Sequence, residues 1–177
     1  MMKLPGRLLV LPAAAMAGLG CALVGGGSVE RPVVTEIAPD QSPAPDRFSL
    51  VELHPSQGDL PALLAVHADR AAELGRRPFV EFSAQWCSSC LQLARSLADE
   101  RMIEAFDGTY IIRLDLDEWK SQLSQTDFVV FGVPAFFEVG GEGRPTGRTI
   151  TGAAWGEDIP ENMAPVLQQF FSATGEG

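Results

Sequence analysis

Residues 79–90 read FVEFSAQWCSSC, and this stretch decides the fold. Its first six residues are mostly apolar, so they predict a buried strand that carries one acid, Glu81, in its middle. A short turn follows, and apolar residues then recur at helical spacing as far as Asp99. The stretch therefore predicts a strand, a turn and a helix, with Cys87 and Cys90 at the start of the helix.

The position of the two cysteines predicts thiol chemistry. A thiol at the start of a helix meets unpaired backbone N–H groups and the positive end of the helix dipole, and both stabilise a thiolate. Lowering a thiol pKa from about 8.5 to about 7 needs roughly 2 kcal/mol, which such a site can supply. Cys90 lies one turn further on, within reach of a mixed disulfide on Cys87. We therefore expect Cys87 to be an exposed nucleophile and Cys90 to be the resolving thiol.

Other uses of a Cys-x-x-Cys pair are open. A zinc site needs four ligands, and the chain has no second cysteine pair and no His-x-x-x-His motif. Copper(I) held by two thiolates is chemically possible, and so is a structural disulfide. The alternative to redox exchange is thus a module that binds copper(I) or docks a partner without turnover.

Working outward from this stretch, the patterns predict an α/β domain. A mixed central sheet with helices on both faces is expected, because strands and helices alternate before a final hairpin and helix. The expected elements are a helix from the cap Asp59 to 74, the strand 79–84, helices ending at 99 and covering 101–106, the strand 110–116, a helix 120–128, the strands 133–139 and 148–152, and a last helix that begins with a capping box of Asp158 and Glu161 around Pro160.

The N-terminal part of the chain predicts export. Residues 1–27 have a basic start and a long uncharged stretch, as in a signal peptide or membrane anchor. Cys21 follows a small residue in a sequence that resembles a bacterial lipoprotein cleavage box. Lipid attachment at Cys21, an uncleaved anchor and ordinary cleavage near residues 25–28 remain open, and each of them exports a single domain.

Between the leader and the domain we expect a tether. Residues 28–56 are polar and rich in proline, which predicts a flexible linker. Within them, residues 48–53 alternate apolar and polar side chains, which predicts an added edge strand. The folded domain is expected over residues 57–172, followed by a short tail over 173–177.

Composition narrows the function further. The net charge of the chain is −10, and no basic stripe interleaved with aromatic residues occurs, which argues against nucleic-acid binding. Three cysteines in 177 residues are too few for a disulfide-stapled scaffold. His67 falls on or beside the apolar face of the first helix, where we expect a partly buried structural role.

Residues 79–90, together with Val133-Pro134, resemble the thioredoxin family, and the resemblance extends over about residues 57–171. It implies that Glu81 is the buried acid that relays a proton for Cys90. It also implies that Val133-Pro134 is the cis-proline loop that pairs with substrate, and that Trp86 bounds the substrate groove.

The resemblance departs from the family pattern in two places. Arg113 lies where the family usually has a lysine, and arginine cannot give up its proton. Ser88-Ser89 is neither the Gly-Pro of cytoplasmic thioredoxins nor the Pro-His of strong oxidants, so the direction of electron flow stays open.

The chain is most similar to exported members such as the periplasmic reductase domain of the DsbD transporter. This implies a membrane-tethered thiol–disulfide oxidoreductase on the periplasmic side that reduces disulfides of exported proteins and serves cell redox homeostasis. A transmembrane thiol protein would then supply the electrons. No flavin or nicotinamide motif is visible, so no cofactor and no metal are expected.

Overall fold

The computed structural model describes residues 47–173. The predictions for the leader 1–27 with Cys21, for the linker up to residue 46, and for the tail from residue 174 lie outside the described residues.

The domain is built on a five-stranded sheet with the order β1-β3-β2-β4-β5. β1 and β2 both pair with β3 in parallel, whereas β4 runs antiparallel to β2 and to β5. The strands are β1 (Ser49–Leu53), β2 (Arg77–Ser83), β3 (Thr109–Asp115), β4 (Ala135–Val139) and β5 (Pro145–Thr151).

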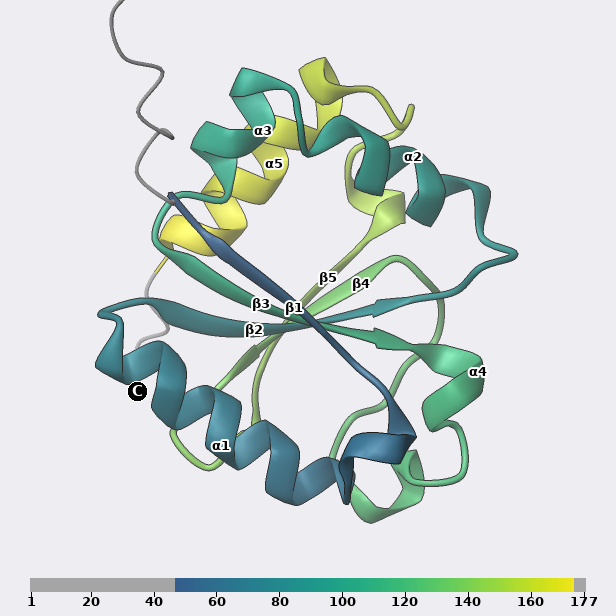
Figure 1. Ribbon diagram of the computed structural model, residues 1–177. Coiled ribbons are helices and arrows are strands. Elements are labelled where there is room, and N and C mark those ends of the chain that lie inside the picture. The colour runs from purple at the N-terminus through teal and green to yellow at the C-terminus, as the bar shows by residue number, and fades with distance from the viewer. Residues whose placement is uncertain (1–46, 174–177) are drawn as a thin grey trace, which may run out of the picture. The chain divides into compact units, whose positions relative to one another are not determined.

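Helices cover both faces of the sheet, as the sequence predicted. Figure 1 shows α1 and α4 on one face and α2, α3 and α5 on the other. The helices are α1 (Leu60–Glu73), α2 (Ser88–Ser96), α3 (Glu100–Ala105), α4 (Leu116–Trp119) and α5 (Pro160–Ser172), with short 3-10 turns at Pro55–Gln57, Leu123–Gln125 and Gly152–Ala154.

The central strands bury both of their faces, which explains their continuous apolar runs. Val80, Phe82 and Ile112 point into the core under α1 and α4. Phe79 and Ile111 point into the core under α2, α3 and α5. Alternation along β2 and β3 thus supplies two separate cores from adjacent residues.

β1 is the edge strand that the alternation over residues 48–53 predicted. β1 lies inside residues 28–56, which the sequence assigned to the linker. Residues 49–53 therefore belong to the folded domain, which begins earlier in the chain than the predicted boundary at Gln57. Leu53 at the end of β1 is buried, and its carbonyl oxygen accepts a hydrogen bond of 3.0 Å from Nε1 of Trp119. The alternation over these few residues indicated a strand, but it did not show that the strand belongs to the sheet of the domain.

The helix predicted over residues 120–128 is wrong. The chain instead turns into α4 directly at the end of β3 and then makes the 3-10 turn Leu123–Gln125. Asp115 starts α4, because its side chain accepts hydrogen bonds from the N–H groups of Asp117 and Glu118 at 2.9 and 3.3 Å. The apolar residues of the segment, such as Phe128, reach the core from a loop.

The two helix starts that carried cap predictions behave differently. Asp59 caps α1 as predicted, with its side chain accepting from the N–H of Ala62. The capping box predicted for α5 is wrong: Ile159 is the N-cap residue and makes no side-chain cap. Asp158 accepts a hydrogen bond from Nε1 of Trp155, and Glu161 pairs with Arg101 on α3. Asp158 is therefore held by a residue three positions earlier in the chain, and Glu161 by a residue of another helix, instead of by the cap that the sequence predicted.

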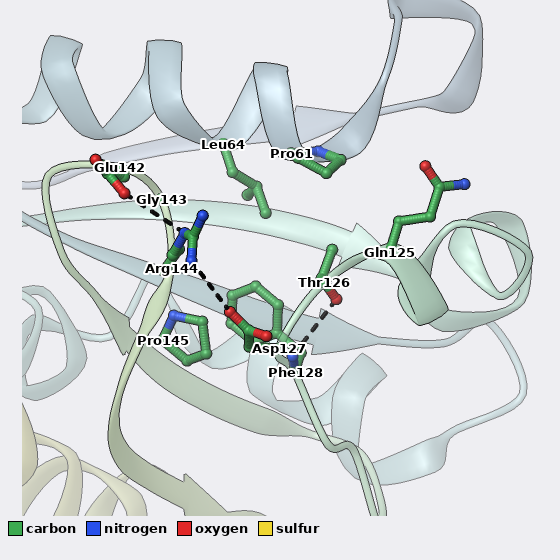
Figure 2. A pocket seen from close by; sticks show the side chains of 10 residues that line it. All are labelled: Pro61, Leu64, Gln125, Thr126, Asp127, Phe128, Glu142, Gly143, Arg144 and Pro145. Carbon is green, nitrogen blue, oxygen red and sulfur yellow. Dashed lines mark hydrogen bonds and ion pairs between the residues drawn. The ribbon is translucent and has the colours of Figure 1, made fainter.

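The turn between β4 and β5 packs directly on α1. Gly143 has a φ of 70°, and a Cβ atom there would lie 2.5 Å from the backbone carbonyl carbon of Leu64. A cavity of about 270 Å³ lies beside this contact, and Figure 2 shows the side chains that line it. Among them, the Arg144 guanidinium lies 3.9 Å from Asp127 and 3.5 Å from Glu142. The close approach of Gly143 to Leu64 fixes the hairpin against α1.

Candidate active site

The turn after β2 places Cys87 directly before the first residue of α2. Cys87 is the N-cap residue of the helix, and its Sγ atom accepts a hydrogen bond of 3.1 Å from the backbone N–H of Cys90. The N–H of Cys87 itself donates to the carbonyl oxygen of Ala84, at 3.2 Å, and so closes the turn. Sulfur therefore takes the part that an oxygen acceptor has in an ordinary helix cap.

Cys87 and Cys90 form a disulfide, with their Cα atoms 5.2 Å apart. Cys87 has 6% of its surface exposed and Cys90 has 2%. The nucleophile predicted to be exposed is thus the more accessible of the pair, but it is largely covered. Val133 packs against the small buried cluster that the two cysteines form with Ala84.

The loop before β4 faces this disulfide. The Val133–Pro134 peptide bond is cis, and the carbonyl oxygen of Val133 lies 3.5 Å from Sγ of Cys87. The carbonyl oxygen of Pro134 accepts a hydrogen bond of 2.9 Å from the N–H of Gly152, which ties the loop to the end of β5. The structure therefore brings together Cys87 and the Val133-Pro134 pair, which are 46 residues apart in the sequence.

Glu81 and Arg113 are register partners on β2 and β3. Nε of Arg113 donates a hydrogen bond of 3.0 Å to Oε2 of Glu81, and the Glu81 side chain is fully buried. Among residues 47–173, Oε1 of Glu81 and Nη2 of Arg113 have no hydrogen-bond partner. Burial raises the pKa of Glu81 above its ordinary value, and the neighbouring guanidinium of Arg113 opposes this rise.

Arg113 of this ion pair and Cys90 line the same cavity, which has a volume of about 180 Å³. Cys90 lines it from α2 and Arg113 lines it from β3. His54 and Glu118 also line it, and their side chains form an ion pair with Nδ1 and Oε2 2.9 Å apart. Its hydrogen bond to Glu118 raises the pKa of His54. No sequence pattern relates His54 or Glu118 to Cys90, because only the fold brings all three to the same cavity.

Trp86 lies on the outer side of the disulfide and is exposed. Its Nε1 donates a hydrogen bond of 2.7 Å to Oδ2 of Asp117. Asp117 is on α4, so this bond sets the orientation of the indole ring from a second element. Sequence reasoning had no signal for this role, since the bond joins residues 31 positions apart.

His67, by contrast, has the structural role that the sequence predicted. Its Nδ1 lies 2.8 Å from the hydroxyl oxygen of Tyr110, and partial burial lowers its pKa.

Across residues 47–173, no group of three or more His, Cys, Asp or Glu side chains is placed to hold a metal ion. Within the same residues, no helix combines the length and the apolar character that crossing a membrane requires.

No protein-family model matches the chain. The chain is 32% identical over 108 residues to the thiol:disulfide interchange protein TxlA of Synechococcus elongatus. The match covers 57% of this chain and 56% of that protein, so the chain spans slightly more than half the length of its relative.

Two solved structures are similar at low identity. A disulphide isomerase from Xylella fastidiosa is 17% identical with a TM-score of 0.49, and the match covers 64% of this chain and 89% of that one. A poplar thioredoxin h is 20% identical with a TM-score of 0.43, over 60% of this chain and 85% of that one.

The mixed sheet and the cysteine pair at the start of α2 are features that the sequence pattern predicted. The cis-proline loop beside the pair is the feature that the resemblance to thioredoxins implied. The chain therefore has a thioredoxin-like fold, in which the Cys87–Cys90 disulfide lies beside the Val133-Pro134 loop.

Proposed function

We propose that this protein is a thiol–disulfide oxidoreductase that exchanges disulfides through Cys87 and Cys90. The observation that carries the proposal is the position of Cys87 as the cap of α2, with its sulfur 3.1 Å from the N–H of Cys90. The name of its relative, a thiol:disulfide interchange protein, supports the same chemistry.

The reaction begins from the reduced pair. The Cys87 thiolate attacks one sulfur of a partner disulfide, forms a mixed disulfide and releases the other partner sulfur as a thiolate. The Cys90 thiolate then attacks Sγ of Cys87, and the second partner sulfur leaves. Two electrons pass to the partner, and the Cys87–Cys90 disulfide forms. A dithiol donor returns the pair to the reduced state by the same two steps in reverse.

The start of α2 stabilises the attacking form of Cys87. The N–H of Cys90 already points at the sulfur, and a hydrogen bond to a charged acceptor is about twice as strong as a neutral one. The helix dipole adds about 0.3–1 kcal/mol in the same direction. The two effects together favour a thiolate near neutral pH.

The buried acid accounts for the proton of Cys90. An acid with a raised pKa accepts a proton near neutral pH more readily than an ordinary carboxylate does. Glu81 has this property, and Arg113, its partner, lines the cavity that Cys90 also lines. We propose that the Cys90 proton passes through this cavity to Glu81. The permanent charge of Arg113 holds the carboxylate in place and takes no proton itself.

The direction of exchange and the partners extend the proposal. The resemblance to exported reductase domains favours a reductant that acts on disulfides of exported proteins and is recharged by a transmembrane thiol protein. The predicted leader, with Cys21 as the candidate lipid attachment site, supports a tether on the periplasmic side of a membrane.

Turnover with insulin as a disulfide substrate and dithiothreitol as donor tests the exchange. Cys87→Ser abolishes turnover, and Cys90→Ser accumulates a mixed disulfide with the substrate, seen on a non-reducing gel. Cys21→Ser is the matched control, because it removes a cysteine far from the pair in the sequence and keeps turnover. Turnover that survives Cys87→Ser overturns the proposal. Tight copper(I) binding without any turnover favours the alternative module.

The reduction potential of the Cys87–Cys90 pair tests the direction. A value near about −270 mV indicates a reductant, whereas one near about −120 mV indicates an oxidant. Equilibration with glutathione or dithiothreitol buffers, followed by alkylation of free thiols, measures it.

Fractionation tests the tether. In a bacterial host that is fed a labelled fatty acid, label that enters the unmodified protein and is absent from Cys21→Ser indicates a lipid on Cys21. Membrane-bound protein that takes up no label indicates the uncleaved anchor instead.

A further inference from the structure

The loop before β4 carries an aromatic side chain that is almost fully exposed to solvent. Phe131 has 95% of its surface exposed, and Val129, two residues earlier, has 61% exposed. Large apolar side chains at this degree of exposure are informative where they cluster beside a reactive group, since isolated ones are common on protein surfaces. The mechanism proposed above uses neither residue.

Phe131 forms one wall of a groove, which we call the Phe131 groove. Its volume is about 490 Å³, and it is lined by Ser89, Phe131, Gly132, Val133, Pro134, Thr151, Gly152, Ala153, Gly156 and Asp158. Ser89 lies between the two cysteines, and the carbonyl oxygen of Val133 lies 3.5 Å from Sγ of Cys87. A chain that is covalently bound at Cys87 can therefore continue directly into the groove.

Small residues keep the opposite wall open. A Cβ atom at Gly152 would lie 3.1 Å from Cδ of Pro134, which is closer than a side chain normally packs. Gly152, Ala153 and Gly156 together leave a volume larger than one amino-acid side chain occupies. The space fits a polypeptide segment of a few residues, whereas a small disulfide would fill only part of it.

The groove also has a charge preference. Asp158 is the only charged residue among those that line it. Oδ1 of Asp158 accepts a hydrogen bond of 3.0 Å from Nε1 of Trp155, which holds the carboxylate in one orientation. A basic side chain on a bound segment complements this carboxylate, and an acidic one is repelled by it.

We propose that the Phe131 groove selects polypeptide disulfides whose flanking residues are apolar and basic, with Phe131 as the specificity-determining residue. This inference rests on the proposed function and names its substrate class. An apolar side chain next to the partner cysteine packs on Phe131, and a basic side chain faces Asp158. A small disulfide reaches Cys87 without covering Phe131, so it gains nothing from this contact.

Single-turnover kinetics of the reduced full-length protein test the proposal, with the fluorescence of Trp86 next to the disulfide as the signal. The probes are the symmetric disulfides of two short peptides, one with leucine and arginine beside its cysteine and one with glycine and glutamate, and hydroxyethyl disulfide. In Phe131→Ala, the second-order rate constant for the leucine–arginine peptide falls about tenfold, as for loss of an aromatic anchor. The rate constant for hydroxyethyl disulfide changes less than twofold.

Three further variants sharpen the test. Phe131→Leu restores most of the peptide rate, because it keeps an apolar side chain in place. Asp158→Asn keeps the acceptor for Trp155 and lowers the preference for the leucine–arginine peptide about threefold. Val66→Ala is the matched control: Val66, on α1, is 62% exposed, close to the exposure of Val129, and lies outside the groove, so its removal leaves all rates unchanged.

Equal slowing of hydroxyethyl disulfide and peptide in Phe131→Ala would overturn the inference, because Phe131 would then shape the cysteine pair itself. Unchanged peptide rates would overturn it as well. If the unmodified protein reduces none of the three probes, the proposed function fails before the question of selectivity arises.

Discussion

Burial and the neighbouring Arg113 shift the pKa of Glu81 in opposite directions. Removal from water favours its neutral form, and the guanidinium at 3.0 Å favours its charged form. Burial is the larger of the two effects, so the pKa of Glu81 is raised. Oε1 of Glu81 and Nη2 of Arg113 have no hydrogen-bond partner in the part of the chain that the structure describes, which adds to the cost of the charged state. The residue with the strongest case as proton acceptor for Cys90 is therefore also a source of instability.

The stability of the protein should reveal this raised pKa. Between the ordinary value of 4.5 and the raised value, folded Glu81 keeps a proton that the unfolded chain has released. The free energy of unfolding that Glu81 contributes therefore falls as pH rises through this window. Urea unfolding of the unmodified protein and of Glu81→Gln, from about pH 4 to 8, should show their difference moving in favour of the glutamine variant.

Glu161 provides a control of opposite sign. A hydrogen bond from its own backbone N–H and the guanidinium of Arg101 lower the pKa of Glu161. The stability that Glu161 contributes is present above its ordinary pKa and is lost as pH falls. The free energy of unfolding of Glu161→Gln should therefore fall relative to that of the unmodified protein as pH rises. If the difference in free energy of unfolding between Glu81→Gln and the unmodified protein changed with pH in the same direction as that of Glu161→Gln, the effect of Arg113 on the pKa of Glu81 would outweigh the effect of burial.

Among the elements, the β4–β5 hairpin and α1 are coupled by backbone contact. Leu64 is buried in the core, and Gly143 lies against its backbone in the left-handed region of φ. Any side chain at position 143 is strained by its φ and also collides with the helix. The hairpin can therefore dock only where glycine allows the approach.

We expect Gly143→Ala to destabilise the protein by about 2–4 kcal/mol, from overpacking and backbone strain together. Gly141→Ala in the same turn has no atom within 4 Å of its new Cβ and should change the stability by less than about 0.5 kcal/mol. Thermal unfolding of both variants measures the difference. Equal effects would show that the turn moves freely away from α1.

The start of α5 offers a stabilising change. Ile159 occupies the N-cap position, is partly exposed and provides no acceptor for the free N–H groups of the first turn. Ile159→Ser should raise the free energy of unfolding by about 1 kcal/mol, because the hydroxyl oxygen can accept from those groups. Ile159→Ala provides the comparison, since it removes the same apolar side chain without adding an acceptor. A serine variant no more stable than the alanine variant would contradict this assignment of the cap.

For the whole domain, β1 decides where the fold begins. It covers one edge of β3 and brings Leu53 under Trp119 of α4. Without it, β3 would present an unpaired edge, which is a template for aggregation. The domain is therefore complete only with the residues before Gln57.

A chain that starts at Gln57 should aggregate or unfold, while one that starts at Arg47 should be soluble and cooperatively folded. Circular dichroism during heating and size-exclusion chromatography compare the two. A stable chain from Gln57 would show that the fold does not require β1.

The sequence by itself determined the local parts of this protein. Residues 79–90 predicted β2, the turn and the cysteines at the start of α2, because a strand period, a turn and a helix period follow one another within twelve positions. The same local logic predicted the Asp59 cap of α1 and the structural role of His67, and the resemblance added the Val133-Pro134 loop.

Tertiary structure decided what depends on distant partners. Glu161 completes the pattern of a capping box with Asp158, but Arg101, 60 residues away, binds it instead. Only the fold brings His54 to the cavity that Cys90 lines, Asp117 to Trp86, and Phe131 to the groove that Ser89 lines. Sequence periodicity cannot predict such contacts, because it describes residues that are close along the chain. The residues of a site are close in space and come from distant parts of the chain.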